Sequence, residues 1–217
     1  MRAAPRPEDV EAALALLFPT DVAVSVVEIG TAGLALFPEE QASLPAAVPA
    51  RLVEFAAGRQ AARRAMAALG HDVVPVPMGR DRAPIWPPGL SGSISHAGGI
   101  AAAVLRSGPP LGLDLEADEP LDSDLWPIIC SEPELGAHPV TDRGLAVRRV
   151  FAAKEAVYKA QFPLTGQVIG FDAVAIAFRN SDFNACFLQG VGPIPEGFEM
   201  HGRIARKCGL ILAGVAT

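Results

Sequence analysis

Hydrophobic and polar positions follow two periods along the chain, one typical of strands and one typical of helices. The strand-like segments are short apolar or alternating runs, and they cover residues 22–29, 100–107, 111–116, 171–179, 183–188 and 198–206. The helix-like segments repeat their apolar positions every three or four residues, and they cover residues 51–69, 121–129 and 142–161. The N-terminal segment PRPEDVEAALALL predicts a further capped helix.

A proline-rich segment, residues 75–96, separates the first main helix from the strand at 100–107, and we expect this segment to be a loop. The sequence SGPP, near residue 108, is typical of a connector. Each half of the chain then holds strands and one main helix. We therefore expect an α+β protein with two subdomains of similar size, residues 1–108 and 109–217, which meet along a seam.

Composition narrows the class of protein. The chain has 217 residues, of which 50% are hydrophobic, enough for one large domain or two small ones. The net charge of -6 argues against a general nucleic-acid-binding protein. The longest apolar runs, GGIAAAVL and GLILAGVA, fall well short of the roughly 20 residues of a membrane span, so we expect none. Cys130, Cys186 and Cys208 are far apart and odd in number, which indicates a cytoplasmic protein without a disulfide framework.

The helical segment FAAKEAVYKA carries charges where apolar side chains are expected. On a helical wheel with Leu145 as the origin, Phe151 and Tyr158 fall at about 240° and 220°. On the same wheel Glu155 and Lys159 fall at about 280° and 320°, inside the apolar arc. A charge turned toward a core is costly unless it has a partner, so this face is expected to meet a ligand or an opposing charge.

The strand-like segment LGLDLE presents a second unusual face. Its leucines alternate with Gly112, Asp114 and Glu116, so two carboxylates project side by side. A raised pKa or a cation such as Mg²⁺ relieves their repulsion, and Glu155 supplies a third oxygen ligand. Lys159, one turn beyond Glu155, can hold an anion that bridges to the metal. The alternatives are a solvated strand face and an ordinary Glu to Lys helix pair.

The first main helix carries arginines near its apolar face. With Leu52 as the origin, Arg51, Arg59 and Arg63 fall at about 260°, 340° and 20°, beside the apolar arc. Arg64 falls at about 120°, on the solvated side. Three inward arginines with no inward acid on the same helix indicate a bound anion, most simply a phosphate. The alternative is that each arginine extends past the edge of the core to solvent.

The segment GSISHAGG offers another set of ligand contacts. Its small residues let the backbone approach a ligand closely and present N–H groups, with hydroxyls from Ser93 and Ser95. His96 can add a phosphate contact, and the alternative is an ordinary loop histidine. Trp86, a few residues earlier, is expected to contribute packing.

These segments occur in the order EFAAGRQAARRAMAALG, APIWPPGLSGSISH, GLDLE and FAAKEAVYKA. In this arrangement the chain resembles the 4′-phosphopantetheinyl transferases, specifically the monomeric two-subdomain type that serves siderophore, polyketide and nonribosomal peptide synthesis. The tryptophan-to-histidine segment looks most like the enterobactin-synthase branch. The resemblance covers most of the chain apart from its N-terminal segment. It implies a pseudo-twofold α+β fold with coenzyme A in the cleft between the halves.

The implied reaction is transfer of the phosphopantetheine arm of coenzyme A to a serine of an apo carrier protein of acyl, peptidyl or aryl type. Asp114, Glu116 and Glu155 match the metal-binding acids, for Mg²⁺ with Mn²⁺ as an alternative. Lys159 matches the lysine that contacts the pyrophosphate, and Lys154 lies next to the reaction. The carrier serine loses its proton to Glu155 or to a metal-bound water, and adenosine 3′,5′-bisphosphate leaves.

The resemblance also assigns the cationic positions. Arg51, Arg59 and His96 match basic positions that bind the phosphates of coenzyme A. Arg63 and Ser95 belong to the same candidate set through the helical and loop patterns described above.

One departure and two rival functions accompany this hypothesis. Some relatives have a lysine just before the glycine of the loop that here holds Met78, and Arg80 or Arg82 can reach the same region. A Mg²⁺-dependent phosphohydrolase acting on coenzyme A or a nucleotide is the first rival, because three acids and a phosphate patch can serve water as well as a serine. A binding protein without turnover is the second. We expect a monomer that binds no nucleic acid.

Overall fold

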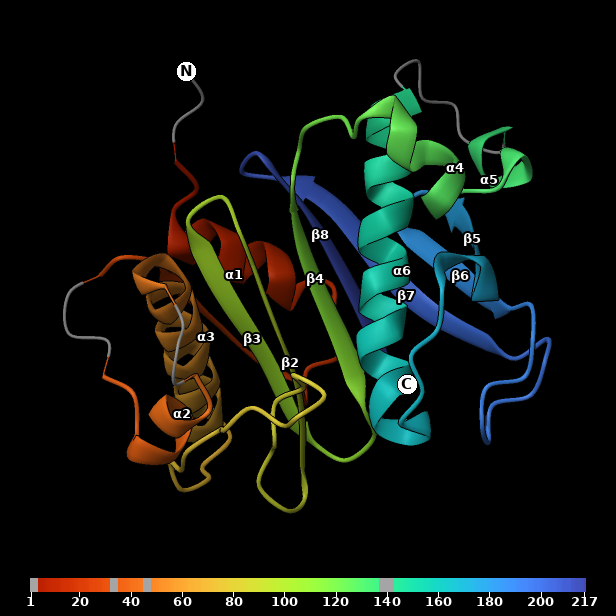
Figure 1. Ribbon diagram of the computed structural model, residues 1–217. Coiled ribbons are helices and arrows are strands. Elements are labelled where there is room, and N and C mark those ends of the chain that lie inside the picture. The colour runs from red at the N-terminus through yellow and green to blue at the C-terminus, as the bar shows by residue number, and fades with distance from the viewer. Residues whose placement is uncertain (1–3, 32–34, 45–47, 137–142) are drawn as a thin grey trace.

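The computed structural model of the chain describes residues 4–31, 35–44, 48–136 and 143–217 (Figure 1). Its strands are β1 (Ala23–Glu28), β2 (Leu90–Ala97), β3 (Ile100–Ser107), β4 (Leu111–Ala117), β5 (Val174–Arg179), β6 (Asp182–Phe187), β7 (Glu199–Lys207) and β8 (Leu210–Ala216). Its α-helices are α1 (Pro7–Ala15), α2 (Pro38–Ala42), α3 (Pro49–Ala68), α4 (Trp126–Ile129), α5 (Glu132–Gly136) and α6 (Arg143–Thr165).

The strands form two antiparallel sheets. One has three strands in the order β1-β3-β2, and the other has five in the order β4-β8-β7-β6-β5. Together with the helices this confirms the expected α+β class. The chain leaves the first sheet at Ser107 and enters the second at Leu111, while the subdomain limits 1–108 and 109–217 stay a prediction.

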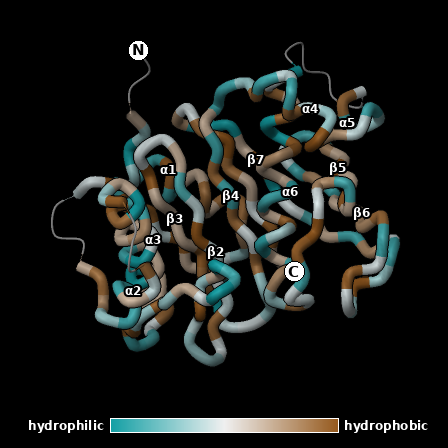
Figure 2. Tube along the Cα trace, viewed as in Figure 1, coloured by the Kyte–Doolittle hydropathy of each residue, from teal (hydrophilic) through white to brown (hydrophobic). Residues whose placement is uncertain are grey.

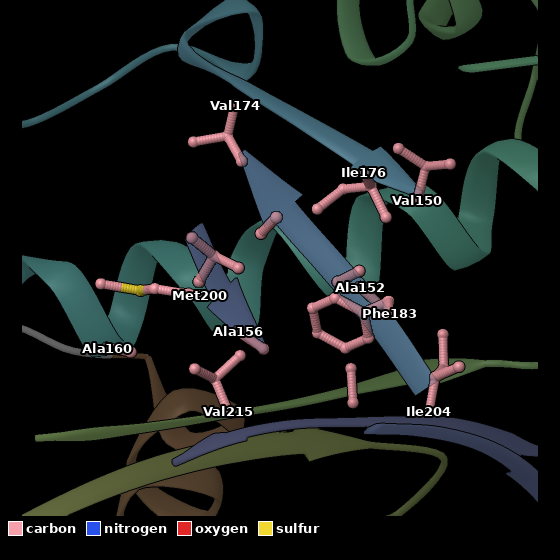
Figure 3. Close-up of a cluster of buried hydrophobic side chains, with 14 of the residues drawn as sticks. Val150, Ala152, Ala156, Ala160, Val174, Ile176, Phe183, Met200, Ile204 and Val215 are labelled. Atoms are coloured by element: carbon pink, nitrogen blue, oxygen red, sulfur yellow. The ribbon is translucent and has the colours of Figure 1, made fainter. Parts of the chain in front are cut away.

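Each sheet carries one of the two long helices on the same side of the molecule (Figure 1). On β3, Ala101 and Ala103 contact the cluster under α3, whereas Ile100 and Val104 contact the cluster under α1. Successive strand residues point to opposite faces, so α3 and α1 cover opposite faces of the three-stranded sheet. Helix α6 covers the five-stranded sheet, and alanines spaced one turn apart let it lie close (Figure 3). These alanines are Ala152, Ala156 and Ala160.

Helix α1 joins the two sheets through a shared apolar cluster. Its Val10 and Leu14 pack with Val26 of β1, Leu113 of β4 and Leu212 of β8. Figure 2 shows the hydrophobic positions concentrated on the central strands and the hydrophilic ones on the outer turns. Because one apolar cluster continues across both sheets, separating the halves would expose it to water. Across the described residues, none of the helices combines the length and apolar composition that a bilayer crossing requires.

Strand β2 differs from the sequence-based expectation of a loop. All eight of its residues pair in register with β3, from Leu90 opposite Ser107 to Ala97 opposite Ile100. Ser and Gly have low strand propensity, but a partner strand on one side and β4 on the other override that preference. Strand β8 was likewise not among the strands expected from the sequence. The expected helix start at Asp142 lies outside the described residues.

Gly112 on β4 lies directly against the backbone of α6. A Cβ at this position would overlap the carbonyl oxygen of Ala156 and approach the amide nitrogen of Ala160 to 2.9 Å. Backbone atoms cannot rotate away as a side-chain end can, so only glycine fits. The close contact brings the face of β4 that carries Asp114 up to α6.

We therefore expect Gly112→Ala to lower the free energy of unfolding by about 2 kcal/mol or more, because overpacking against backbone forces α6 away from β4. Urea denaturation measures the change. Gly136→Ala is the matched control, since a Cβ at Gly136 meets open space, and its effect is expected to stay within about 0.5 kcal/mol. A Gly112 variant as stable as the wild type would contradict the role of the contact.

Candidate active site

Three of the predicted site residues meet at the seam between the two sheets. Asp114 comes from β4, Ser95 from β2 and Lys159 from α6. The Lys159 ammonium lies 2.6 Å from Asp114 Oδ1, and the Ser95 hydroxyl donates to the same oxygen at 3.1 Å. Lys159 also donates to the Leu113 carbonyl at 3.1 Å. The helix charge that looked misplaced in the sequence is therefore the partner of a strand carboxylate.

Asp114 is buried, with 4% of its surface exposed. Its second carboxylate oxygen, Oδ2, has no hydrogen-bond partner within the described parts of the chain. A buried carboxylate oxygen without a donor is unfavourable, and most such groups in proteins are satisfied. Oδ2 is therefore suited to receive a cation or a ligand donor.

The two other predicted acids lie in the field of Asp114. Burial raises the pKa of Glu116, and the negative charge of Asp114 raises it further, while Arg148 opposes the shift from 2.7 Å. Burial also raises the pKa of Glu155, which Lys159 lowers and Asp114 raises. The charge of Asp114 thus acts on both glutamates.

The chemistry of these groups fits a divalent cation. Oxygen ligands from carboxylates are those that Mg²⁺ prefers, and a cation would relieve both the repulsion and the unpartnered Oδ2. Within the residues that the structure describes, however, no cluster of three or more His, Cys, Asp or Glu side chains is already gathered as a metal site. Glu116 is turned to Arg148 instead, so binding of an ion requires it to exchange that partner.

A second group of side chains lies beside the first. Arg51 of α3 donates to Nε2 of His96 on β2 at 3.0 Å and contacts Glu54 at 3.2 Å. Because Arg can only donate, Nε2 is the acceptor and the ring proton is on Nδ1. Burial lowers the pKa of His96, with the charges of Arg51 and Lys159 adding to the shift and Glu54 opposing it. The imidazole is therefore neutral and close to both Arg51 and the Lys159 cluster.

Arg59 is a buried cation of α3 for which the described part of the chain provides no acid partner. Its Nε donates to the Val76 carbonyl at 2.6 Å, and its guanidinium lies 3.8 Å from the centroid of the Phe55 ring. Its Nη2 is buried and unpaired among the described residues. Burial lowers the pKa of this guanidinium to about 10. A cation held in this way is suited to an incoming anion.

Arg63 differs from its expected role. The sequence showed no inward acid on its own helix, but Glu40 of α2 supplies one at 2.7 Å. Arg63 also donates to the Ala35 carbonyl and to Gln60. With these partners Arg63 holds α2 against α3, and Glu40 in turn accepts from the Val76 N–H.

Lys154 also has a full set of internal partners. Its ammonium donates to the carbonyls of Ile129 and Phe171, both at 2.8 Å, and forms an ion pair with Glu134 at 2.9 Å. Both members of the pair are buried. Glu134 accepts as well from the Ile176 N–H at 3.0 Å. This geometry ties α4, α5 and β5 to α6.

Two hollows lie near the ends of these elements. A pocket of about 230 Å³ adjoins the site at Glu155, with Tyr158, Ile169 and Phe171 among its lining residues. A larger hollow of about 770 Å³ lies at the C-terminal end of α1, where Phe18 and His201 are among its lining residues. None of the predicted site residues lines the larger hollow.

Sequence reasoning missed four charged partners. Helical spacing could have indicated two of them. Arg148 lies two turns before Glu155, and Glu54 lies one turn after Arg51, so each shares a helix face with a predicted site residue. No local pattern indicates Glu40 and Glu134, because their partners are 23 and 20 residues away on other elements.

The loop that holds Met78 lies beside the end of α2, since the Met78 N–H donates to the Ser43 hydroxyl.

Comparison with known proteins identifies the family. Residues 39–106 match the family model described as the 4′-phosphopantetheinyl transferase N-terminal domain, and residues 110–202 match that of the 4′-phosphopantetheinyl transferase superfamily. The chain is 39% identical over 202 residues to 4′-phosphopantetheinyl transferase Svp of Streptomyces mobaraensis, covering 84% of this chain and 78% of the relative. It is 34% identical over 186 residues to 4′-phosphopantetheinyl transferase Npt of Nocardia iowensis, covering 82% and 77%.

A third relative is enterobactin synthase component D of Salmonella typhi, 37% identical over 135 residues, which cover 60% of this chain and 56% of that protein. The chain therefore belongs to the 4′-phosphopantetheinyl transferase superfamily, as its sequence resemblance indicated, and it is an enzyme of that class. Its position nearest the enterobactin-synthase branch stays a prediction.

The buried pair of Lys154 gives a test that separates structural from catalytic roles. We expect Lys154→Met to lower the free energy of unfolding by about 3–5 kcal/mol, because it leaves Glu134 buried without its cation. Lys207→Met, at an exposed strand end, is the matched control and is expected to stay within about 0.5 kcal/mol. Thermal and urea unfolding measure both. A Lys154 variant that keeps full stability and loses only activity would instead support a catalytic lysine.

Proposed function

We propose that this protein transfers the 4′-phosphopantetheine arm of coenzyme A to the serine hydroxyl of an apo carrier protein. In this step the serine oxygen forms a bond to the β-phosphorus of coenzyme A. The bond from that phosphorus to the bridging oxygen breaks, and adenosine 3′,5′-bisphosphate leaves with the electron pair. The serine proton passes to a base in the site.

One observation carries the proposal beyond membership of the family. Asp114 is fixed at its Oδ1 by Ser95 and Lys159 and keeps a buried Oδ2 without a partner among the described residues. His96, which Arg51 contacts, feels the charges of both Asp114 and Lys159. A transfer between phosphate esters needs fixed positive charge around an oxygen-rich substrate and little covalent chemistry from the protein. The seam provides this combination.

Asp114, Glu116 and Glu155 are the residues that would hold Mg²⁺, or Mn²⁺ in its place. When bound, such an ion supplies positive charge that stabilises the phosphate oxygens as the bond breaks. The protein contributes Glu116 and Glu155, whose pKa values burial raises first and the charge of Asp114 raises further. The identity of the metal stays a prediction.

Arg51, His96 and Arg59 are assigned to the phosphates of coenzyme A. Arg51 and His96 already converge at 3.0 Å, and Arg59 has a buried Nη2 without a partner among the described residues. Charge-assisted hydrogen bonds to phosphate are stronger than neutral ones, and more so where water is excluded. Arg63 is not needed for this assignment, because its guanidinium is engaged by Glu40.

Glu155 is the group we assign to accept the serine proton. Its pKa is raised by burial and by Asp114, which makes it a better base than an exposed glutamate. Lys159 lies one helical turn from Glu155 and contacts Asp114, and its charge lowers the pKa of Glu155 in part. Lys154, with three internal partners, supports the helix that carries both residues.

The names of the relatives favour transfer over the rival phosphohydrolase. The partner is then an apo carrier protein of acyl, peptidyl or aryl type, in a siderophore, polyketide or nonribosomal peptide pathway. We infer a monomeric, cytoplasmic enzyme.

The proposal is tested by incubating the protein with coenzyme A, Mg²⁺ and a panel of apo carrier proteins, followed by intact-mass spectrometry. We expect one or more carriers to gain the mass of phosphopantetheine, and EDTA to abolish the gain. Asp114→Asn should slow transfer by at least about a hundredfold, because it removes charge that acts in the transition state. Asp182→Asn, an exposed change of the same kind, is the matched control. Release of adenosine 3′,5′-bisphosphate without any mass gain would show hydrolysis instead.

A ligand and protein cycle tests the role of Arg59. Dephospho-coenzyme A lacks the 3′-phosphate, so we expect the wild type to bind it more weakly than coenzyme A by about 1–3 kcal/mol if Arg59 contacts that phosphate. Arg59→Met keeps the packing on Phe55 but removes the charge, and should reduce the difference toward zero. Isothermal titration calorimetry measures all four affinities.

A general loosening of α3 would weaken the binding of both ligands by the same amount, so this effect would cancel in the cycle. If Arg59→Met still prefers coenzyme A by the wild-type margin, Arg59 does not contact the 3′-phosphate, and the pair Arg51 and His96 becomes the site to test.

A further inference from the structure

The seam between the two sheets is closed by serine side chains instead of a backbone ladder. β2 lies next to β4, yet its backbone pairing in the structure is with β3, and that of β4 is with β8. The Leu113 N–H donates to the Ser93 hydroxyl at 3.0 Å, and the Leu115 N–H donates to the Ser95 hydroxyl at 3.1 Å. Both serines are buried. Two hydroxyls thus replace the carbonyls that a neighbouring strand would provide.

The Ser95 hydroxyl is fully engaged by partners within the protein. A hydroxyl carries one donor and two acceptor lone pairs. Here it donates to Asp114 Oδ1 at 3.1 Å and accepts from the Leu115 N–H at 3.1 Å and from Lys159 at 3.3 Å. Contact with a phosphate oxygen would require it to release Asp114.

The consequence falls on Asp114. An aspartate carboxylate turns easily about its last bond, and two donors on one oxygen hold its plane. With Ser95 and Lys159 both on Oδ1, the other oxygen, Oδ2, is left buried and without a partner in the described chain. The same two donors therefore decide which oxygen is offered to a ligand.

We propose that Ser95 is a positioning residue that orients the Asp114 carboxylate for a divalent cation. Only the identity of the ion in this proposal rests on the proposed function, because the hydrogen bonds around Asp114 are a property of the protein alone. It adds a positioning role to the ligand contact that the sequence pattern predicts for Ser95.

Ser93 provides a matched control on the same strand. Its hydroxyl accepts a backbone N–H across the seam as that of Ser95 does, and Asp114 is absent from its hydrogen bonds in the described structure. Ser93→Ala and Ser95→Ala therefore remove equivalent contacts from the seam, and only the second removes the donor to Asp114.

The test uses Mn²⁺ as the probe, without coenzyme A or carrier, and follows free Mn²⁺ by electron paramagnetic resonance. We expect Ser95→Ala to weaken Mn²⁺ binding about 10- to 100-fold, as other groups that orient metal ligands do, and Ser93→Ala to change it less than about twofold. Both variants should shift the urea midpoint by similar amounts. If Ser95→Ala does not fold, Ser95→Cys keeps the size with a weak donor and should weaken binding by at least about threefold.

Kinetics give a second readout. A positioning role predicts that Ser95→Ala lowers kcat with little change in the KM for coenzyme A, whereas a direct ligand would raise that KM. Wild-type Mn²⁺ affinity in Ser95→Ala, equal loss in Ser93→Ala, or no Mn²⁺ binding by the wild type would each overturn the proposal. Ser95-dependent Mn²⁺ binding in a protein that transfers nothing to any carrier would support it while contradicting the proposed function.

Discussion

The ion pair between Asp114 on β4 and Lys159 on α6 is the contact on which the rest of the site depends. Nζ of Lys159 lies 2.6 Å from Oδ1 of Asp114, and the Asp114 side chain is 5% exposed. A buried charge that loses its partner is strongly destabilising, so this pair fixes where α6 lies along β4. Gly112 makes the approach feasible, because the α6 backbone occupies the space that any other residue would need. The strand acids and the helix acid Glu155 come together only through that close packing.

The lysines of α6 show how one helix serves two purposes. Lys154 and Lys159 are five residues apart, which places them on faces about 140° apart. Lys159 joins the seam, and Lys154 pairs with Glu134 on the opposite side of the helix. The arginines of α3 divide in a similar way, because Arg63 is satisfied by Glu40 while Arg59 keeps an unpaired nitrogen. Among these cations of the described chain, Arg59 thus keeps a buried nitrogen without a partner, whereas Arg63, Lys154 and Lys159 each pair with a carboxylate.

The cluster around Asp114 draws residues from both sheets, and the pair of Arg51 and His96 lies on α3 and β2, so the geometry of the site depends on how the sheets are joined. Helix α1 packs on strands of both sheets through one apolar cluster, and Ser93 and Ser95 bond to β4 across the seam. Apolar burial holds the halves together without direction, whereas the hydroxyls set the register of β2 against β4. This register places His96 near Asp114 and Lys159, as the effect of both charges on its pKa indicates.

The sequence alone determined the class of fold and the two long helices. It also showed which charged side chains of these helices lie on the buried face. Periodicity reports which face a side chain occupies, so the inward placement of Glu155 and Lys159 and the alternation around Asp114 were visible in it. Only the tertiary structure decided what each charge meets. Glu40 and Glu134 are distant in sequence from Arg63 and Lys154, and no local pattern links them. Strand β2 was hidden for the same reason, because its small residues form a strand only where β3 and β4 supply partners on either side.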